Sequence, residues 1–177
     1  MPLLRRKPGV ARGAARPEDF EILNTDPWTR VADDAPLEDG HSLVSWARSQ
    51  RDREALLSRA QSTGVIIPND LSESELERLL PFALIAIQFP KFRDGRGFTF
   101  ARWLRSRWNY QGELRAVGDV LRDQLLFMHR TGFDSFELRE GKDPKDALGA
   151  FAEQSAFYQA SSDLPAPLWK RTKRESP

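Results

Sequence analysis

Residues 82–108 read FALIAIQFPKFRDGRGFTFARWLRSRW. The apolar run at 82–87 predicts a buried strand, and the Asp94-Gly95 dipeptide favours a turn. The stretch from about Phe98 to Trp108 predicts a helix. This segment is therefore a β-α unit, the building block of parallel α/β folds.

Similar units recur along the chain. Ser72 stands three residues before Glu75, a capping box that opens a helix, and Asp143-Pro144 is typical of another helix start. The expected strands lie at 65–67, 84–89, 113–117 and 136–138, and the expected helices at about 72–80, 98–108, 120–130 and 144–159. Four consecutive β-α units predict an α/β fold with a small parallel sheet, either an open sheet or a half-barrel, and we prefer the open sheet.

The composition changes at both ends of the chain. Residues 1–18 contain many arginines and little to bury, so we expect a disordered basic tail. Residues 161–177 are rich in proline, serine and basic side chains and are expected to form a flexible tail on which Trp169 could dock. A single α/β domain is expected at 19–160.

The first part of this domain is the least regular. Residues 20–39 could form one or two irregular strands that Trp28 anchors. Residues 43–60 fit a partly amphipathic helix, which Ser42 could cap.

Composition limits the possible chemistry. The 177 residues carry a net charge of +1 and no cysteine. The absence of cysteine excludes a disulfide framework, a thiolate zinc site, a cysteine-ligated iron–sulfur cluster and a cysteine nucleophile. The near-neutral charge makes nucleic acid an unexpected partner. No apolar run approaches the ~18 residues of a membrane span and the first residues lack a signal-peptide core, so we expect a cytoplasmic protein without a membrane role.

Charged residues gather in the loops after the expected strands, where ligands bind in parallel α/β folds. The loop at 91–97 is strongly basic and leads into a helix, an arrangement that attracts anions. The residues predicted to bind an anion or a partner are Lys91, Arg93, Arg96, Gly97, Arg122 and Arg139. Alternatively, Arg93 and Arg96 pair with Asp94, Asp119 or Glu140 and tie neighbouring loops together.

If the protein is an enzyme, Asp119 and Glu140 are the candidate general acid–base residues. Asp119 could instead cap the following helix, near whose end lies His129, for which we expect a structural role. No metal-ligand, Ser-His-Asp or P-loop spacing is present, so no metal site is expected. Aromatic residues between the arginines mostly suit the core, and any that stay exposed would suit a protein interface.

Two motifs resemble a known bacterial family of unknown function. Residues 89–98 fit the pattern FPKF-x-DGRG-(Y/F), residues 112–124 fit GELRA-x-GDV-x-x-DQ, and a Gly-Phe pair follows at 132–133. The resemblance runs from roughly Trp28 to Tyr158; at Thr131, relatives often have cysteine. Members are often called oxidoreductases, and their genes frequently adjoin those of assimilatory sulfite reductase and phosphoadenylyl-sulfate reductase.

The resemblance implies a role in sulfate assimilation and cysteine biosynthesis, but it supplies no catalytic residues. The sequence contains no dinucleotide fingerprint, cluster ligands or thiols, so we expect no cofactor. The preferred hypothesis is an accessory protein that binds sulfite reductase, another sulfate-assimilation protein or a sulfur oxyanion. The alternative is an enzyme acting on a small anionic substrate at the carboxyl ends of the strands.

Overall fold

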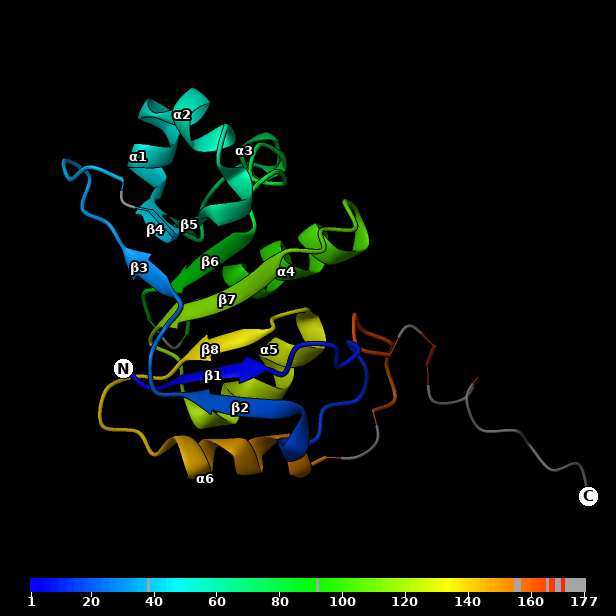
Figure 1. Ribbon diagram of the computed structural model, residues 1–177. Coiled ribbons are helices and arrows are strands. Elements are labelled where there is room, and N and C mark those ends of the chain that lie inside the picture. The colour runs from blue at the N-terminus through cyan, green and yellow to red at the C-terminus, as the bar shows by residue number, and fades with distance from the viewer. Residues whose placement is uncertain (38, 92, 155–156, 165, 168–169, 171–177) are drawn as a thin grey trace, which may run out of the picture.

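The computed structural model describes residues 1–37, 39–91, 93–154, 157–164, 166–167 and 170. They form an α/β fold around one eight-stranded sheet with the order β2-β1-β8-β7-β6-β5-β4-β3 (Figure 1). The strands are β1 (Leu3–Arg6), β2 (Phe20–Leu23), β3 (Trp28–Arg30), β4 (His41–Ser45), β5 (Thr63–Ile67), β6 (Leu84–Phe89), β7 (Glu113–Gly118) and β8 (Ser135–Glu137).

The helices follow the strands in alternation. They are α1 (Trp46–Arg51), α2 (Arg53–Leu57), α3 (Glu73–Glu77), α4 (Arg96–Ser106), α5 (Leu125–Thr131) and α6 (Pro144–Leu148). Short 3₁₀ turns lie at η1 (Pro17–Asp19), η2 (Ala60–Ser62), η3 (Arg122–Gln124) and η4 (Gly149–Ala152).

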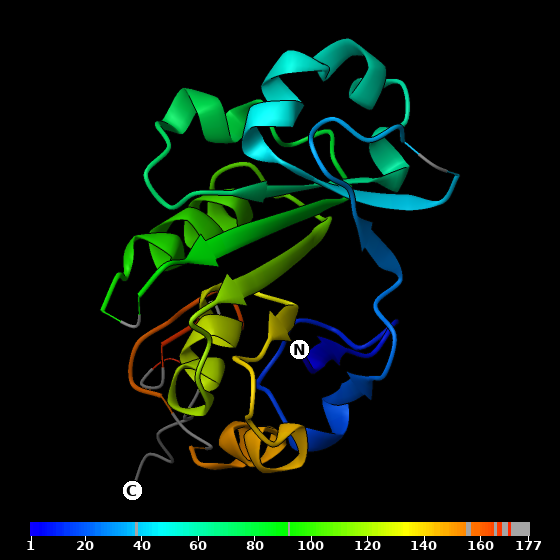
Figure 2. The same ribbon diagram turned by 90° about the vertical axis from the view of Figure 1, so that its left-hand side faces the viewer.

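The sheet winds in one direction. Strands β3 to β8 are parallel and adjacent in chain order, whereas β1 pairs antiparallel with both β8 and β2. Because successive right-handed crossovers run the same way, the helices collect on one side and the sheet curls into a half-barrel (Figures 1 and 2). The predicted α/β class and parallel units are confirmed, and the half-barrel is the observed form rather than the open sheet that we preferred.

The two faces of the sheet bury different side chains. The outer face carries the main core against the helices, with Ile85, Ile87 and Phe89 of β6 fully buried. The inner face carries a smaller apolar cluster that includes Trp28 and Leu84.

Ion pairs cross the inside of the half-barrel. The Arg115 side chain is fully buried and donates to Asp26 at 2.5 Å and to Glu113 at 2.9 Å. Arg30 of β3 contacts Glu137 of β8 at 2.7 Å, although four strands separate β3 from β8 in the sheet. These pairs join edge strand β3 to β8, and the short link between β2 and β3 to β7, across the inside of the half-barrel.

The predicted disordered tail at 1–18 is wrong. It contains β1, which lies inside the sheet between β2 and β8, with Leu4 fully buried. Two leucines give almost no local signal, and the strand is stable because it pairs with distant partners on both sides.

The predicted helix at 43–60 is also wrong in its first residues. Leu43 and Val44 belong to β4, because two adjacent apolar residues fit a helix and a strand equally well. The helix starts at Trp46, and its cap is Ser45, whose hydroxyl accepts from the Arg48 N–H at 3.0 Å, rather than Ser42.

The remaining elements differ mainly at their ends. The capping box of Ser72 and Glu75 and the cap by Asp143 are confirmed. Residues 20–39 form the two short strands β2 and β3. The last helix ends at Leu148 and continues only as η4, and Trp169 lies outside the described residues. Among the described residues, none of the helices has the length and apolarity needed to cross a membrane.

The position of β1 predicts a large effect of Leu4→Ala. Removing a fully buried leucine should lower the free energy of unfolding by about 2–5 kcal/mol, measured by urea denaturation. The control is Leu57→Ala, at a leucine on the surface, which should change it by about 0.5 kcal/mol or less. Wild-type stability of Leu4→Ala would mean that β1 does not belong to the fold.

Candidate functional site

The basic loop lies where sequence reasoning placed it, between the carboxyl end of β6 and the start of α4. Lys91 and Arg93 are exposed there, and within the described part of the chain no ion pair involves either of them. Helix α4 begins at Arg96, with Gly95 as its cap.

Arg96 pairs with Asp94 at the surface. Its Nε and Nη2 donate to the Asp94 carboxylate at 2.9 and 2.7 Å, and Nη2 also donates to Asn69 Oδ1 at 3.2 Å. The Arg96 hydrogen bonds hold the pKa of Asp94 far below its ordinary value. The side chain of Arg96 is 57% exposed, so the pair lies between the loops after β5 and β6 without being buried.

Gly97 has a packing role. A Cβ atom at this position would lie 2.7 Å from Cζ of the buried Phe89 and 3.1 Å from Ile87 Cγ2. Glycine therefore lets α4 approach β6 closely. Gly95, by contrast, has open space around it, the nearest atom lying 3.8 Å away on Phe98.

The other charged candidates form separate pairs. Arg139 contacts Asp119 at 3.3 Å. Arg122 contacts Glu153 and donates from Nε to the Asp146 carbonyl at 3.1 Å. The fourth candidate of this group, Glu140, is exposed. Arg139, Asp119 and Arg122 are thus neutralised locally, in two groups that are distinct from the Arg96–Asp94 pair.

His129 is buried in the core rather than in this loop region. Its Nε2 lies 2.9 Å from the Gly13 carbonyl oxygen, and its ring meets Phe20 edge-on at 5.5 Å. Burial lowers the pKa of His129, so the ring is neutral at pH 7. This environment agrees with a structural role.

An exposed aromatic residue lies beside the basic loop. Phe127 of α5 is 53% exposed, and its ring is 5.0 Å from that of Phe98, which in turn contacts Phe89 at 5.3 Å. Sequence reasoning missed Phe127. The signal was the run of four apolar residues at 125–128, since a helix cannot turn four successive side chains toward one core.

The contact between Phe98 and Phe127 joins α5 to the start of α4, and so to the basic loop that precedes it, in one surface. We call it the basic–aromatic face and define it by Lys91, Arg93, Phe98, Arg102 and Phe127. Arg102 is exposed one helical turn after Phe98. An aromatic pair with several cations around it can bind an acidic protein surface.

Residues 64–169 match the family described as bacterial protein of unknown function (DUF934). The chain belongs to the DUF934 family. Comparison with curated proteins and with solved structures gives no match. The DUF934 region begins in β5 and contains both motifs noted in the sequence.

Several motif residues of this DUF934 protein have structural roles. Gly118 has a φ of +100°, and a Cβ there would lie 2.5 Å from the Phe89 carbonyl oxygen. A Cβ at Gly112 would clash with Tyr110. Arg115 is the buried centre of the inner ion pairs, whereas Phe92 of the first motif lies outside the described residues. These residues of the motifs therefore specify the half-barrel.

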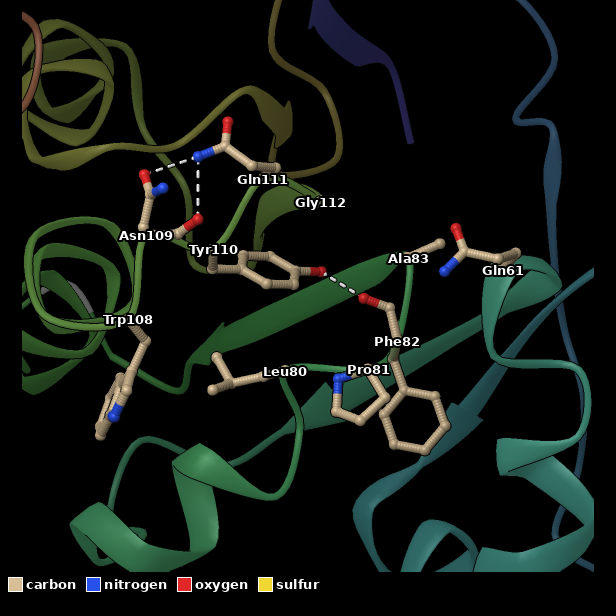
Figure 3. A pocket seen from close by; sticks show the side chains of 10 residues that line it. All are labelled: Gln61, Leu80, Pro81, Phe82, Ala83, Trp108, Asn109, Tyr110, Gln111 and Gly112. Carbon is tan, nitrogen blue, oxygen red and sulfur yellow. Dashed lines mark hydrogen bonds between the residues drawn. The ribbon is translucent and has the colours of Figure 1, made fainter.

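A hollow lies at the opposite end of the sheet, beside the amino ends of β6 and β7 (Figure 3). It measures about 450 Å³ and is lined by aromatic, apolar and amide side chains. On its wall, the Tyr110 hydroxyl donates to the Phe82 carbonyl at 2.7 Å, and burial raises the pKa of Tyr110. Tyr110 is the one titratable residue among those that line it, so the hollow contains little that could transfer protons.

The packing role of Gly97 can be tested with a pair of alanine variants. Gly97→Ala should lower the free energy of unfolding by about 1–3 kcal/mol, because its methyl group would overlap the Phe89 ring. Gly95→Ala should change it by less than about 1 kcal/mol, since nothing lies close to that position. Chemical denaturation measures both. Equal tolerance of the two substitutions would refute the packing role.

Proposed function

We propose that this DUF934 protein is an accessory protein of assimilatory sulfate and sulfite reduction that acts by binding. Its basic–aromatic face would dock on an acidic surface of a reductase or of an electron carrier. The observation that carries the proposal is the half-exposed ring of Phe127. Its surface includes the exposed cations Lys91 and Arg93, which form no ion pair within the described part of the chain.

The face has the chemistry of a transient protein interface. Phe98 supports the ring of Phe127 from one side, so the anchor is preorganised rather than mobile. Lys91 and Arg93 lie in the neighbouring loop and would meet carboxylates of a partner. Such contacts steer association and weaken with salt.

The link to sulfur metabolism rests on the family resemblance in the two motifs. The cationic face agrees with it, because a cation-rich surface suits an acidic partner or a sulfur oxyanion. The enzyme alternative requires Asp119 or Glu140 to act with Arg93 and Arg96 in one pocket. Arg96 and Asp119 are engaged in different local pairs, which favours the binding function.

Deletion of the gene should slow growth on sulfate as sole sulfur source, and cysteine in the medium should restore it, provided no second copy exists. Wild-type protein should complement the deletion, whereas a Lys91→Glu, Arg93→Glu, Phe127→Ser triple variant should not, because charge and anchor are both removed. Growth rate is the measurement.

The control is Tyr158→Ser, which removes a 71% exposed aromatic residue elsewhere on the protein. It should complement fully. Normal growth of the deletion strain on sulfate contradicts the pathway assignment, and full complementation by the folded triple variant contradicts the assignment of the face.

A further inference from the structure

A second charged region lies at the other end of the sheet, around Asp134 at the start of β8. The Asp134 side chain is almost fully buried and accepts from three guanidinium groups, those of Arg6, Arg12 and Arg105. It also accepts from the Leu114 N–H at 3.1 Å. Three positive charges therefore share one carboxylate.

The neighbouring ion pairs do not remove this imbalance. Arg5 is matched by Glu21, and Arg115 is matched by Glu113 and Asp26. Lys7 is exposed, and no ion pair involves it within the part of the chain that the structure describes. The six cations of this region are Arg5, Arg6, Lys7, Arg12, Arg105 and Arg115, and its four carboxylates are those of Glu21, Asp26, Glu113 and Asp134. The region therefore has a surplus of two positive charges.

Four of these six cations line a hollow of about 210 Å³, together with the carboxylates of Glu113 and Asp134. Its wall includes Arg5, Arg6, Lys7 and Arg12, and the turn at Lys7 to Val10 closes one side. The Nε of Arg6 has no hydrogen-bond partner, and Arg12 Nη1 reaches only Gln111, at 3.4 Å. Acceptors are therefore too few for the donors around the hollow.

We propose that this hollow binds a divalent tetrahedral oxyanion, a phosphate or sulfate group, with Arg6, Lys7 and Arg12 as its cationic ligands. Two negative charges balance the local surplus. Arg6 Nε and Arg12 Nη1 are the guanidinium nitrogens left to donate to such an anion, and Lys7 adds a flexible point charge at the rim. The site goes beyond the proposed function, because it lies at the opposite end of the parallel strands from the basic–aromatic face.

The oxyanion could be free or could belong to a larger molecule. Gln111 lines both this hollow and the larger one of about 450 Å³ shown in Figure 3. The larger hollow offers the Trp108 ring and the amides of Asn109 and Gln111 to an uncharged, hydrogen-bonding remainder. The two hollows together are within the usual size range of small-ligand sites.

Isothermal titration at constant ionic strength tests the site with three probes: inorganic phosphate, inorganic sulfate and adenosine 5′-monophosphate. We expect saturable binding of at least one probe to the full chain. Lys7→Gln should weaken it about tenfold because it removes a cation, and Arg6→Lys should do so because an ammonium cannot replace the guanidinium Nε. Lys142→Gln, at an exposed lysine in the loop after β8, is the matched control and should bind like wild type.

The probes also distinguish the two sources of the group. An oxyanion carried by a larger molecule is indicated if adenosine 5′-monophosphate binds more tightly than phosphate and Trp108→Phe removes that difference in affinity. Equal affinities indicate the free ion. The proposal is overturned if no probe binds saturably, or if Lys7→Gln binds as tightly as Lys142→Gln. Lys7→Gln keeps the test decisive even if Arg6→Lys fails to fold, because Lys7 is exposed.

Discussion

The carboxylate of Asp134 joins parts of the chain that are far apart in sequence. Arg6 reaches it from the end of β1, Arg12 from the following loop and Arg105 from the end of α4. Burial by itself would raise the pKa of Asp134, but the charges of Arg105, Arg12 and Arg6 outweigh burial and hold that pKa below its ordinary value. The ionised carboxylate is thus part of the fold. Neutralising it would leave three guanidinium groups close together without a counter-charge.

This interaction explains how a short first strand can cover the edge of β8. The strand has only two apolar side chains, the buried Leu3 and Leu4, and Arg6 fixes its far end to Asp134. With β1 and β2 in place, the inner pairs Arg30–Glu137 and Arg115–Asp26 connect edge strand β3 with β8 and the link between β2 and β3 with β7. The basic loop after β6 and the helices α4 and α5 then present Phe127 and the cations of the basic–aromatic face.

Local sequence predicted those elements whose stability is local. The continuous apolar run of β6 was placed at its observed residues, 84–89, and the Ser72–Glu75 capping box was found. Strand β1 could not be found, because Arg6 meets its partner 128 residues away. The positions of the basic loop residues were predicted, but their pairing was left open between ligands and neighbouring acids. The packing role of Gly97 was also hidden, since it depends on the distance between α4 and the Phe89 ring.

The central claim is that Phe127 and the cations around it dock on a partner in sulfite reduction. The most direct measurement places a photo-crosslinking phenylalanine analogue at position 127 in cells grown on sulfate and identifies the cross-linked protein. The same analogue at Tyr158, also exposed, is the control. We expect a cross-link from position 127 to a sulfite-reducing enzyme or its electron carrier, and none from position 158. No cross-link from position 127, or the same products from both positions, would contradict the claim.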